Sequence, residues 1–268
     1  MQKFVFTGGP CGGKTTSLER VRAFLGQYGI RVYVVPEAAT MMWTNGIAPT
    51  DMKIGDDPRT DPRIAEAIAL DNMPIRVAPE TSEPIKKLLE YSNQIEQDWG
   101  LNHDLERKKM PAFEQIEINQ IIIKGVNDNQ ITLHIHRPAK QTGTLPAVVH
   151  THGGGMTIMS AEDPSYVRWR SLLATHDLVV IGVEFRNAGG RLGNSPFPAG
   201  LNDCASATQW VFDNKRQLDV SSIIISGESG GGNLSIATAL KAKKENWLSQ
   251  INGVYACCPY ISGSYENK

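Results

Sequence analysis

One stretch decides how this chain folds: Ser222-Ile223-Ile224-Ile225-Ser226-Gly227-Glu228-Ser229-Gly230-Gly231. Its first half is an apolar run typical of a buried strand, and the residues after it have helical spacing. Between them lies the pattern G-x-S-x-G. A strand that turns sharply into a helix holds its serine in a strained, exposed position, and the flanking glycines remove side chains that would collide in the turn.

A second motif lies upstream of this turn. His152-Gly153-Gly154-Gly155 directly follows the strand-like run Ala147-Val148-Val149-His150. Backbone N–H groups of such a glycine loop, together with the N–H of the residue after the serine, would form an oxyanion hole. The two motifs together predict nucleophilic chemistry at Ser229.

The bulk composition is that of an ordinary globular protein. The chain has 268 residues, 41% of them hydrophobic and 21% charged, with a formal net charge of -1. This length allows one large domain or two small ones. The charge balance argues against nucleic acid or an anionic membrane as partner. We expect no signal peptide and no membrane span, and the four scattered cysteines favour a reducing, cytoplasmic setting.

Strand-like and helix-like segments alternate along the second half of the chain. This rhythm predicts an α/β fold with a mostly parallel sheet, helices on both of its faces, and two antiparallel strands at its start. The expected strands are 115–123, 131–136, 147–152, 179–184, 223–226 and 253–257, and the expected helices are about 163–175, 201–214 and 231–244.

A phosphate-binding motif opens the chain. Residues 8–16 read Gly8-Gly9-Pro10-Cys11-Gly12-Gly13-Lys14-Thr15-Thr16 and match G-x-x-x-x-G-K-[ST]. A strand-like run precedes the motif, and a helix-like stretch and a second strand-like run follow it. Gly8 and Gly13 would let the backbone wrap a phosphate chain. Lys14 would reach the β- and γ-phosphates of ATP or GTP, and Thr15 would hold Mg²⁺. The alternative is a structural glycine turn before a helix.

This N-terminal segment resembles the P-loop ATPase domain of the TRPL-translocation-defect protein type. The resemblance rests on residues 7–16, Val35-Pro36-Glu37-Ala38-Ala39-Thr40 and Gly46-Ile47. Such domains also need a later strand that ends in an acidic residue, and none follows before Arg63. We therefore expect a partial P-loop βαβ segment, 1–54, which docks on its neighbour or is poorly ordered.

The middle of the chain reads as a linker and a helical cap, 55–114. Gly55 to Arg63 is polar and proline-rich, as at a boundary. Helix-like stretches follow at Ile64–Asn72 and Ser82–Gln97. They are ordinary helices over a core, or they roof a substrate pocket. The remaining part, 115–268, is the α/β core.

From about Asp56 to Lys268 the chain resembles the hormone-sensitive-lipase-type branch of the α/β-hydrolases, near the brefeldin A esterase type. The residues that support this are 150–156, 166–170, 182–187, 196–204 and 227–232. The resemblance implies an α/β-hydrolase fold and Ser229 as nucleophile. It further implies the N–H groups of Gly154, Gly155 and Gly230 as oxyanion donors. The implied substrate is a small-molecule carboxylic ester, hydrolysed through an acyl-enzyme without a cofactor.

The rest of a catalytic triad is absent from the sequence. In α/β-hydrolases an Asp or Glu and then a His follow the serine, but residues 230–268 contain neither Asp nor His. We expect a hydrolase core that is incomplete at its C-terminus, has an unpaired sheet edge and is weak or inactive as an enzyme. A fused or incomplete gene model would explain such a chain, and a real fusion is the other possibility.

Two other functions are open at this stage. The chain could be a P-loop ATP- or GTP-binding protein with a passive hydrolase-like domain, or a non-enzymatic binder of a small ligand. Histidine pairs at His134/His136 and His150/His152 could bind a metal, but no third ligand is evident, and we expect none. We interpret His152 as a support of the glycine loop, Arg186 and Asp203 as a structural pair, and Cys257-Cys258 as small apolar packing residues.

Overall fold

The computed structural model describes residues 3–7, 31–34, 79–80, 82–107, 113–141 and 143–261. Gly8, Gly13, Lys14, Thr15 and the expected boundary near residue 55 lie outside the described residues. The elements are β1 (Lys3–Thr7), β2 (Arg31–Val34), α4 (Ile85–Arg107), β3 (Ile116–Lys124), β4 (Gln130–Pro138), β5 (Leu145–Thr151), α5 (Pro164–Ala174), β6 (Val179–Glu184), α6 (Ala199–Asp213), β7 (Val220–Glu228), α7 (Gly230–Lys244), a 3₁₀ turn (Leu248–Gln250) and β8 (Gly253–Cys257).

The strands form one sheet in the order β2-β1-β8-β7-β5-β6-β4-β3. β3 and β4 pair antiparallel, as do β4 and β6, whereas β5, β6, β7 and β8 run parallel. The expected α/β fold and its two antiparallel strands are therefore confirmed. The central strand β6 is a run of Val, Ile and Gly buried on both faces, which is why it reads as continuously apolar.

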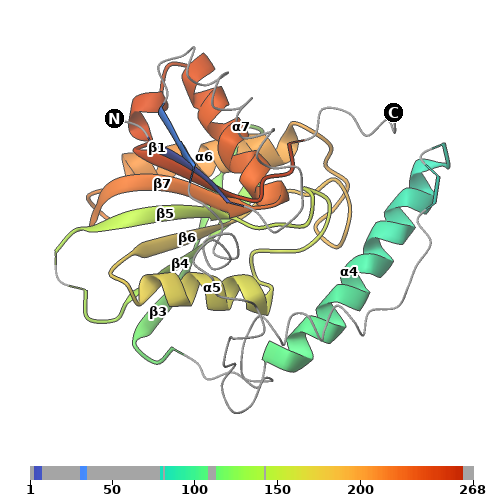
Figure 1. Ribbon diagram of the computed structural model, residues 1–268, viewed down its shortest axis with the longest axis horizontal. Helices are drawn as coiled ribbons and strands as arrows, with labels where there is room; N and C mark the ends of the chain where they lie inside the picture. Colours follow the sequence, from blue (N-terminus) through green and yellow to red (C-terminus); the bar gives the residue numbers. More distant parts are fainter. Residues whose placement is uncertain are drawn as a thin grey trace, which may run out of the picture.

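Helices cover both faces of the sheet (Figure 1). On one face, Cys204, Ala207 and Val211 of α6 pack with Val149 and Ile223 in the main core. α7 lies on the same side, where it packs against β7 and β8. On the other face, α5 packs over β6 and β4. This places the loops that follow β5 and β7 at one edge of the sheet.

One expectation about the edges of the fold was wrong, and one helix is longer than expected. β1 pairs in parallel with β8, Lys3–Thr7 against Gly253–Cys257, so β8 does not leave the unpaired edge that we expected. β2 pairs in parallel with β1 and extends the same sheet. In addition, the helix expected at 82–97 runs on to Arg107, because neither proline nor glycine clustering interrupts that charged stretch.

α4 lies beside the carboxyl ends of the parallel strands (Figure 1). The carboxylate of its Glu96 accepts the backbone N–H of Met159 at 2.6 Å and that of Arg191 at 2.7 Å. A single side chain of α4 thus joins the loop after β5 to the loop after β6. No helix among the described residues combines the length and apolar character needed to cross a membrane.

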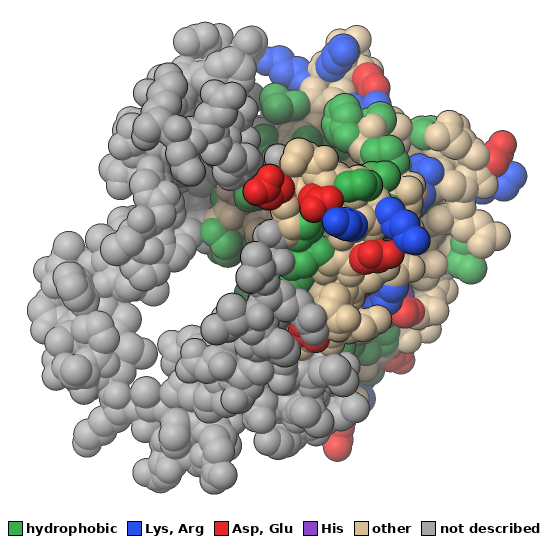
Figure 2. Space-filling model, turned by 90° about the vertical axis from the view of Figure 1, so that its right-hand side faces the viewer, with side chains coloured by type: hydrophobic (Ala, Val, Ile, Leu, Met, Phe, Trp, Pro, Cys, Tyr) green, Lys and Arg blue, Asp and Glu red, His purple; other side chains and the backbone are tan. Residues whose placement is uncertain are grey.

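The surface shows no field of one charge sign on the side nearest α4 (Figure 2). Among the described residues in this view, acidic and basic side chains are interspersed with apolar ones. This fits the formal net charge of -1 for the whole chain.

Candidate active site

Ser229 stands alone between a strand and a helix. β7 ends at Glu228 and α7 begins at Gly230. The backbone of Ser229 has φ 51° and ψ -116°, a combination that residues with a side chain rarely adopt. Such a conformation costs about 1–3 kcal/mol and persists only where the surroundings enforce it. The strained strand-to-helix turn that the sequence predicted is therefore present.

Close packing against β5 enforces this turn. A Cβ on Gly227 would lie 2.4 Å from the carbonyl oxygen of Thr151, and one on Gly231 would lie 2.0 Å from the same oxygen. Both distances are shorter than any real contact, so the first turn of α7 reaches β5 only because these positions lack side chains. The hydroxyl of Thr151 completes the junction by bonding to the Gly231 carbonyl at 2.8 Å.

The glycine loop lies directly beside the serine. Gly154 and Gly155 have φ values of 89° and 63°, which favour glycine. A Cβ on Gly230 would lie 2.8 Å from the amide nitrogens of both Gly155 and Met156. Two of the three glycines predicted to supply oxyanion donors, Gly155 and Gly230, therefore lie in contact, and Gly154 precedes Gly155 in the same loop. Their N–H groups have no hydrogen-bond partner among the described residues.

Glu228 ties the start of the glycine loop to the nucleophile turn. Its carboxylate accepts the Gly153 N–H at 2.9 Å and a hydrogen bond from Nε2 of buried His150 at 3.1 Å. Burial raises the pKa of Glu228, but the interactions with His150 and with Gly153 outweigh burial, and the pKa is lowered overall. A carboxylate is thus retained at neutral pH at this position.

Glu184 fixes the far end of the same loop. It accepts hydrogen bonds from the Ser160 hydroxyl at 2.5 Å and from the Ala161 N–H at 3.1 Å. Burial raises the pKa of Glu184 even though both hydrogen bonds oppose the rise. The loop that carries the oxyanion donors is therefore held by three carboxylates, namely Glu228, Glu184 and Glu96 of α4.

His152 supports the glycine loop, as its position in the sequence suggested. Its ring is fully buried and stacks on Phe185 with centroids 4.1 Å apart at 13°. Nδ1 donates to the Gly153 carbonyl at 2.9 Å, since a carbonyl can only accept. Burial lowers the pKa of His152 to about 3, so the ring is neutral at physiological pH.

The histidines of β4 lie in a hydrogen-bonded layer under α5. Gln120 donates its amide both to Glu162 and to His134 Nδ1, which places the His134 proton on Nε2. His136 Nε2 accepts a hydrogen bond from Arg170 Nε at 3.0 Å. Within the described residues, no three His, Cys, Asp or Glu side chains are grouped so that they could hold a metal ion.

Arg186 and Asp203 form the structural pair that the sequence suggested. The guanidinium donates to both carboxylate oxygens of Asp203, at 2.8 and 2.9 Å, and the Arg186 backbone N–H adds a third bond at 3.0 Å. Asn129 donates to the same carboxylate at 3.0 Å. Asp203 is fully buried, so this cluster joins β6, α6 and the turn before β4 rather than facing a ligand.

No imidazole in the described part of the chain makes a hydrogen bond to Ser229. His150 and His152 stand at the start of the glycine-loop motif, and both are buried and support that loop. The serine and the oxyanion donors are thus brought together, whereas a general base is not.

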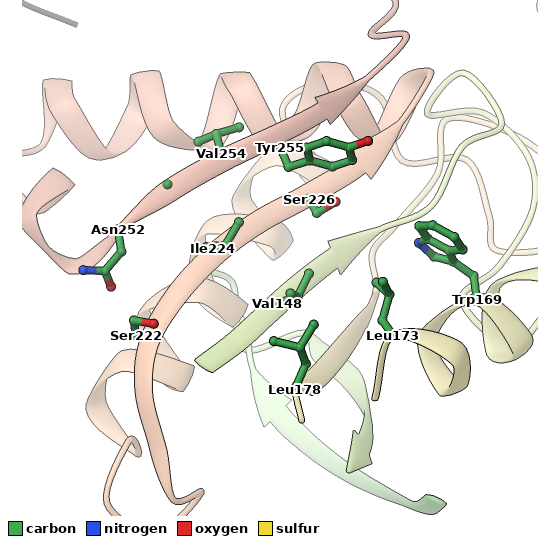
Figure 3. Close-up of a pocket in the computed structure, with 11 residues that line it drawn as sticks. Val148, Trp169, Leu173, Leu178, Ser222, Ile224, Ser226, Asn252, Val254 and Tyr255 are labelled. Atoms are coloured by element: carbon green, nitrogen blue, oxygen red, sulfur yellow. The ribbon is translucent and has the colours of Figure 1, made fainter. Parts of the chain in front are cut away.

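A cavity of about 500 Å³ opens elsewhere, on the face of the sheet next to α5 (Figure 3). Apolar side chains of α5, β5 and β7 converge on it, among them Trp169, Leu173, Val148 and Ile224. Neither Ser229 nor a glycine of the oxyanion loop is among its described lining residues. We therefore give this cavity no part in chemistry at the serine.

Sequence reasoning missed the three glutamates that hold the loop. Glu228 stands inside the G-x-S-x-G pattern, and this position could have indicated a role in holding the site. Glu184 ends an apolar strand and lies among the quoted motif residues, but its partners are 23 and 24 residues away in the chain. Glu96 is one of several charged residues on a helix, and nothing in its local pattern sets it apart.

Comparisons with known proteins support this geometry. A family model described as alpha/beta hydrolase fold matches residues 148–268, and one described as AAA domain matches residues 3–74. A solved structure of brefeldin A esterase, described as a bacterial homologue of human hormone sensitive lipase, is 38% identical with a TM-score of 0.67. It covers 80% of this chain and 60% of its own. Esterase Est22 is 34% identical with a TM-score of 0.64, covering 81% and 66%.

Among curated proteins, the tuliposide A-converting enzyme b1 of Tulipa gesneriana is 28% identical over 170 residues. This match covers 58% of the chain and 42% of that enzyme. The chain thus spans less than half the length of this relative and less than two thirds of the two esterase structures. These matches show the architecture: the chain has an α/β-hydrolase fold and is esterase-like by similarity.

Proposed function

We propose that this chain carries the nucleophile and the oxyanion hole of a carboxylic ester hydrolase. The observation that supports this is the strained Ser229 directly beside Gly154, Gly155 and Gly230. Ser229 Oγ would attack the ester carbonyl, and the three N–H groups would stabilise the oxyanion of the tetrahedral intermediate. The alcohol would leave, and water would release the acyl group from the serine. The reaction needs no cofactor.

The proton of the serine hydroxyl has no acceptor among the described side chains, and residues 230–268 supply no histidine or aspartate. We therefore propose that the chain is weak or inactive in turnover. Loss of a triad member leaves only the catalysis of the oxyanion hole and binding, about 10³–10⁴ over water.

Two measurements on the full chain test this proposal. Hydrolysis of a short-chain p-nitrophenyl ester should stay near the level of Ser229→Ala. Added imidazole should raise it above the rate of imidazole alone only where Ser229 is present, because a free base can then remove the hydroxyl proton. With imidazole present as the base, a fluorophosphonate should label Ser229 and leave Ser229→Ala unlabelled. Fast turnover without imidazole would contradict the claim of inactivity, and equal labelling of both proteins would contradict the assignment of the nucleophile.

A second candidate is nucleotide binding at the N-terminal segment, 1–54. The motif residues Gly8, Gly13, Lys14 and Thr15 directly follow β1, and β1 and β2 pair in parallel as the motif requires. The match of residues 3–74 to an AAA domain favours the same function. ATP or GTP with Mg²⁺ would then be the ligand.

Titration of the full chain with a fluorescent ATP or GTP analogue, with and without Mg²⁺, tests this candidate. Binding should weaken at least about tenfold in Lys14→Ala, since the lysine ammonium contacts the β- and γ-phosphates. Binding that is absent, or equal in both proteins, would remove the candidate. We also propose a reducing, cytoplasmic setting, because the four cysteines of the sequence are few and scattered.

A further inference from the structure

Two adjacent thiols end β8, next to the nucleophile turn. The sulfur atoms of Cys257 and Cys258 lie 4.0 Å apart. Cys258 is exposed and Cys257 is half-buried, which corrects the expectation that both pack as small apolar residues. Cys258 also has a φ of 34°, outside the range that residues with side chains prefer. The pair is therefore accessible at a strained point of the backbone.

The segment that contains this pair holds the backbone of Ser229 on both sides. The Ser229 N–H donates to the Cys257 carbonyl at 3.0 Å, and the Ser229 carbonyl accepts the Tyr260 N–H at 3.0 Å. Asn233 of α7 donates to the Tyr260 carbonyl at 2.7 Å. The unusual conformation of the serine thus depends on where residues 257–260 lie.

A bond between neighbouring cysteines cannot form without a change in this segment. Adjacent Cα atoms are about 3.8 Å apart across a trans peptide. Disulfides usually join Cα atoms about 4.4–6.8 Å apart, and shorter spans are strained and easily reduced. The peptide group that must adjust joins Cys257 to Cys258, and its carbonyl is the acceptor of the Ser229 N–H.

We propose that Cys257 and Cys258 form a redox modification site that controls Ser229. A peroxide oxidises the exposed Cys258 thiol to a sulfenic acid, transferring one oxygen atom and releasing the reduced hydroxyl compound (water, for hydrogen peroxide). The Cys257 thiolate then attacks that sulfur, the S–S bond forms, and hydroxide leaves with a proton as water. The new ring turns the peptide carbonyl away from the Ser229 N–H. A thiol reductant restores both thiols and the original contact.

Oxidation of the full chain tests the modification itself. After treatment with hydrogen peroxide and alkylation of remaining thiols, peptide mapping should show a peptide with residues 257 and 258 linked and lighter by two hydrogen atoms. Dithiothreitol should reverse the change. Cys258→Ser should abolish it, whereas Cys204→Ala should retain it, because burial raises the pKa of the Cys204 thiol and keeps it unreactive. Overoxidised Cys258, or linkage to another cysteine, would overturn the proposal.

The effect on the serine rests on the function proposed above, and fluorophosphonate labelling in the presence of imidazole measures it separately. Labelling of Ser229 should slow about ten- to hundredfold on oxidation, as expected when a reacting group moves by about 1 Å. It should recover on reduction and stay constant in peroxide-treated Cys258→Ser. A linked pair with unchanged labelling would overturn the control of Ser229. No labelling of the reduced protein would instead overturn the proposed function, while the mapping result would still decide the modification site.

Discussion

The guanidinium of Arg170 fills the space above Gly182. A Cβ on Gly182 would lie 2.7 Å from both Cζ and Nε of that side chain. Arg170 is fully buried, and its Nη2 donates to the Ala161 carbonyl at 2.6 Å. Burial lowers the pKa of Arg170 to about 10, while Glu184, Glu228 and Glu162 oppose that effect, so the group is still a cation at neutral pH. It balances the buried carboxylates that hold the oxyanion loop.

Gly182→Ala should therefore destabilise the fold by about 1–3 kcal/mol, the usual cost of overpacking a core. The methyl group would push Arg170 off His136 and the Ala161 carbonyl, which hold it at hydrogen-bonding distance. Chemical denaturation measures the change. In an Arg170→Ala background the same substitution should cost less, because the colliding atoms are gone. An equal cost in both backgrounds would show that the collision is not the cause.

Acidification should unfold the chain through its buried histidines. Burial lowers the pKa of His136 and of His152 from 6.5 to about 3. Between pH 6.5 and about pH 3, these histidines bind protons in the unfolded chain but not in the folded chain, so stability is lost as the pH falls. Each histidine contributes a slope of about 1.4 kcal/mol per pH unit. Denaturation curves at pH 7.5 and 5.5 measure this loss.

His136→Gln should reduce the pH dependence of stability even if it lowers stability at pH 7.5, because it removes one of the three histidines, His134, His136 and His152, whose pKa burial lowers. The matched control is His176→Gln, at an exposed position on the turn after α5. It should retain the full dependence. A chain as stable at pH 5.5 as at pH 7.5 would contradict this account.

Glu228→Gln should slow imidazole-assisted fluorophosphonate labelling of Ser229 by about tenfold and reduce stability by about 1–3 kcal/mol. The amide has one acceptor oxygen, so it cannot serve both the Gly153 N–H and His150 Nε2, which the carboxylate now does. Glu117→Gln, at an exposed position on β3, is the control and should change neither quantity. Unchanged labelling in Glu228→Gln would show that the glycine loop is held without it.

The sequence was sufficient for the features that depend on local pattern. The parallel strands, the three helices of the α/β core and the turn at Ser229 follow from apolar periodicity and from glycines at fixed offsets, and these were found where predicted. Gly227 and Gly231 also had a local reason, because a sharp turn needs residues without side chains.

Contacts between distant residues could not be read in this way. Pairing of β1 with β8 joins segments about 250 residues apart, and neither strand carries a mark of its partner. The contact between Arg170 and Gly182 could not be predicted either. A glycine within a strand indicates that another group packs closely against the backbone, but it does not identify that group. The exposure of Cys258 depends on the path of the chain after β8, which no periodicity fixes.

Glu96 gives the last prediction, which concerns the attachment of α4. Its two carboxylate oxygens accept N–H groups from two separate loops, Met159 at 2.6 Å and Arg191 at 2.7 Å. Glu96→Ala leaves both N–H groups without this acceptor. An N–H group that is shielded from water and loses its acceptor lowers the free energy of unfolding by about 1–3 kcal/mol. We expect α4 to detach before the sheet unfolds, because the described part of the helix has only one buried residue, Asp98.

Hydrogen exchange measures this detachment directly. In Glu96→Ala, amides of α4 and of the two loops should exchange faster, while those of β5 and β7 keep their protection. The control is Glu90→Ala on the same helix. The Glu90 side chain is 62% exposed, and its ion pair with Lys86 is long at 3.9 Å, so this substitution should leave exchange unchanged. If both variants behaved alike, apolar packing rather than the Glu96 bridge would hold α4. If the oxyanion loop alone became labile, the bridge would matter for the loop and not for the helix.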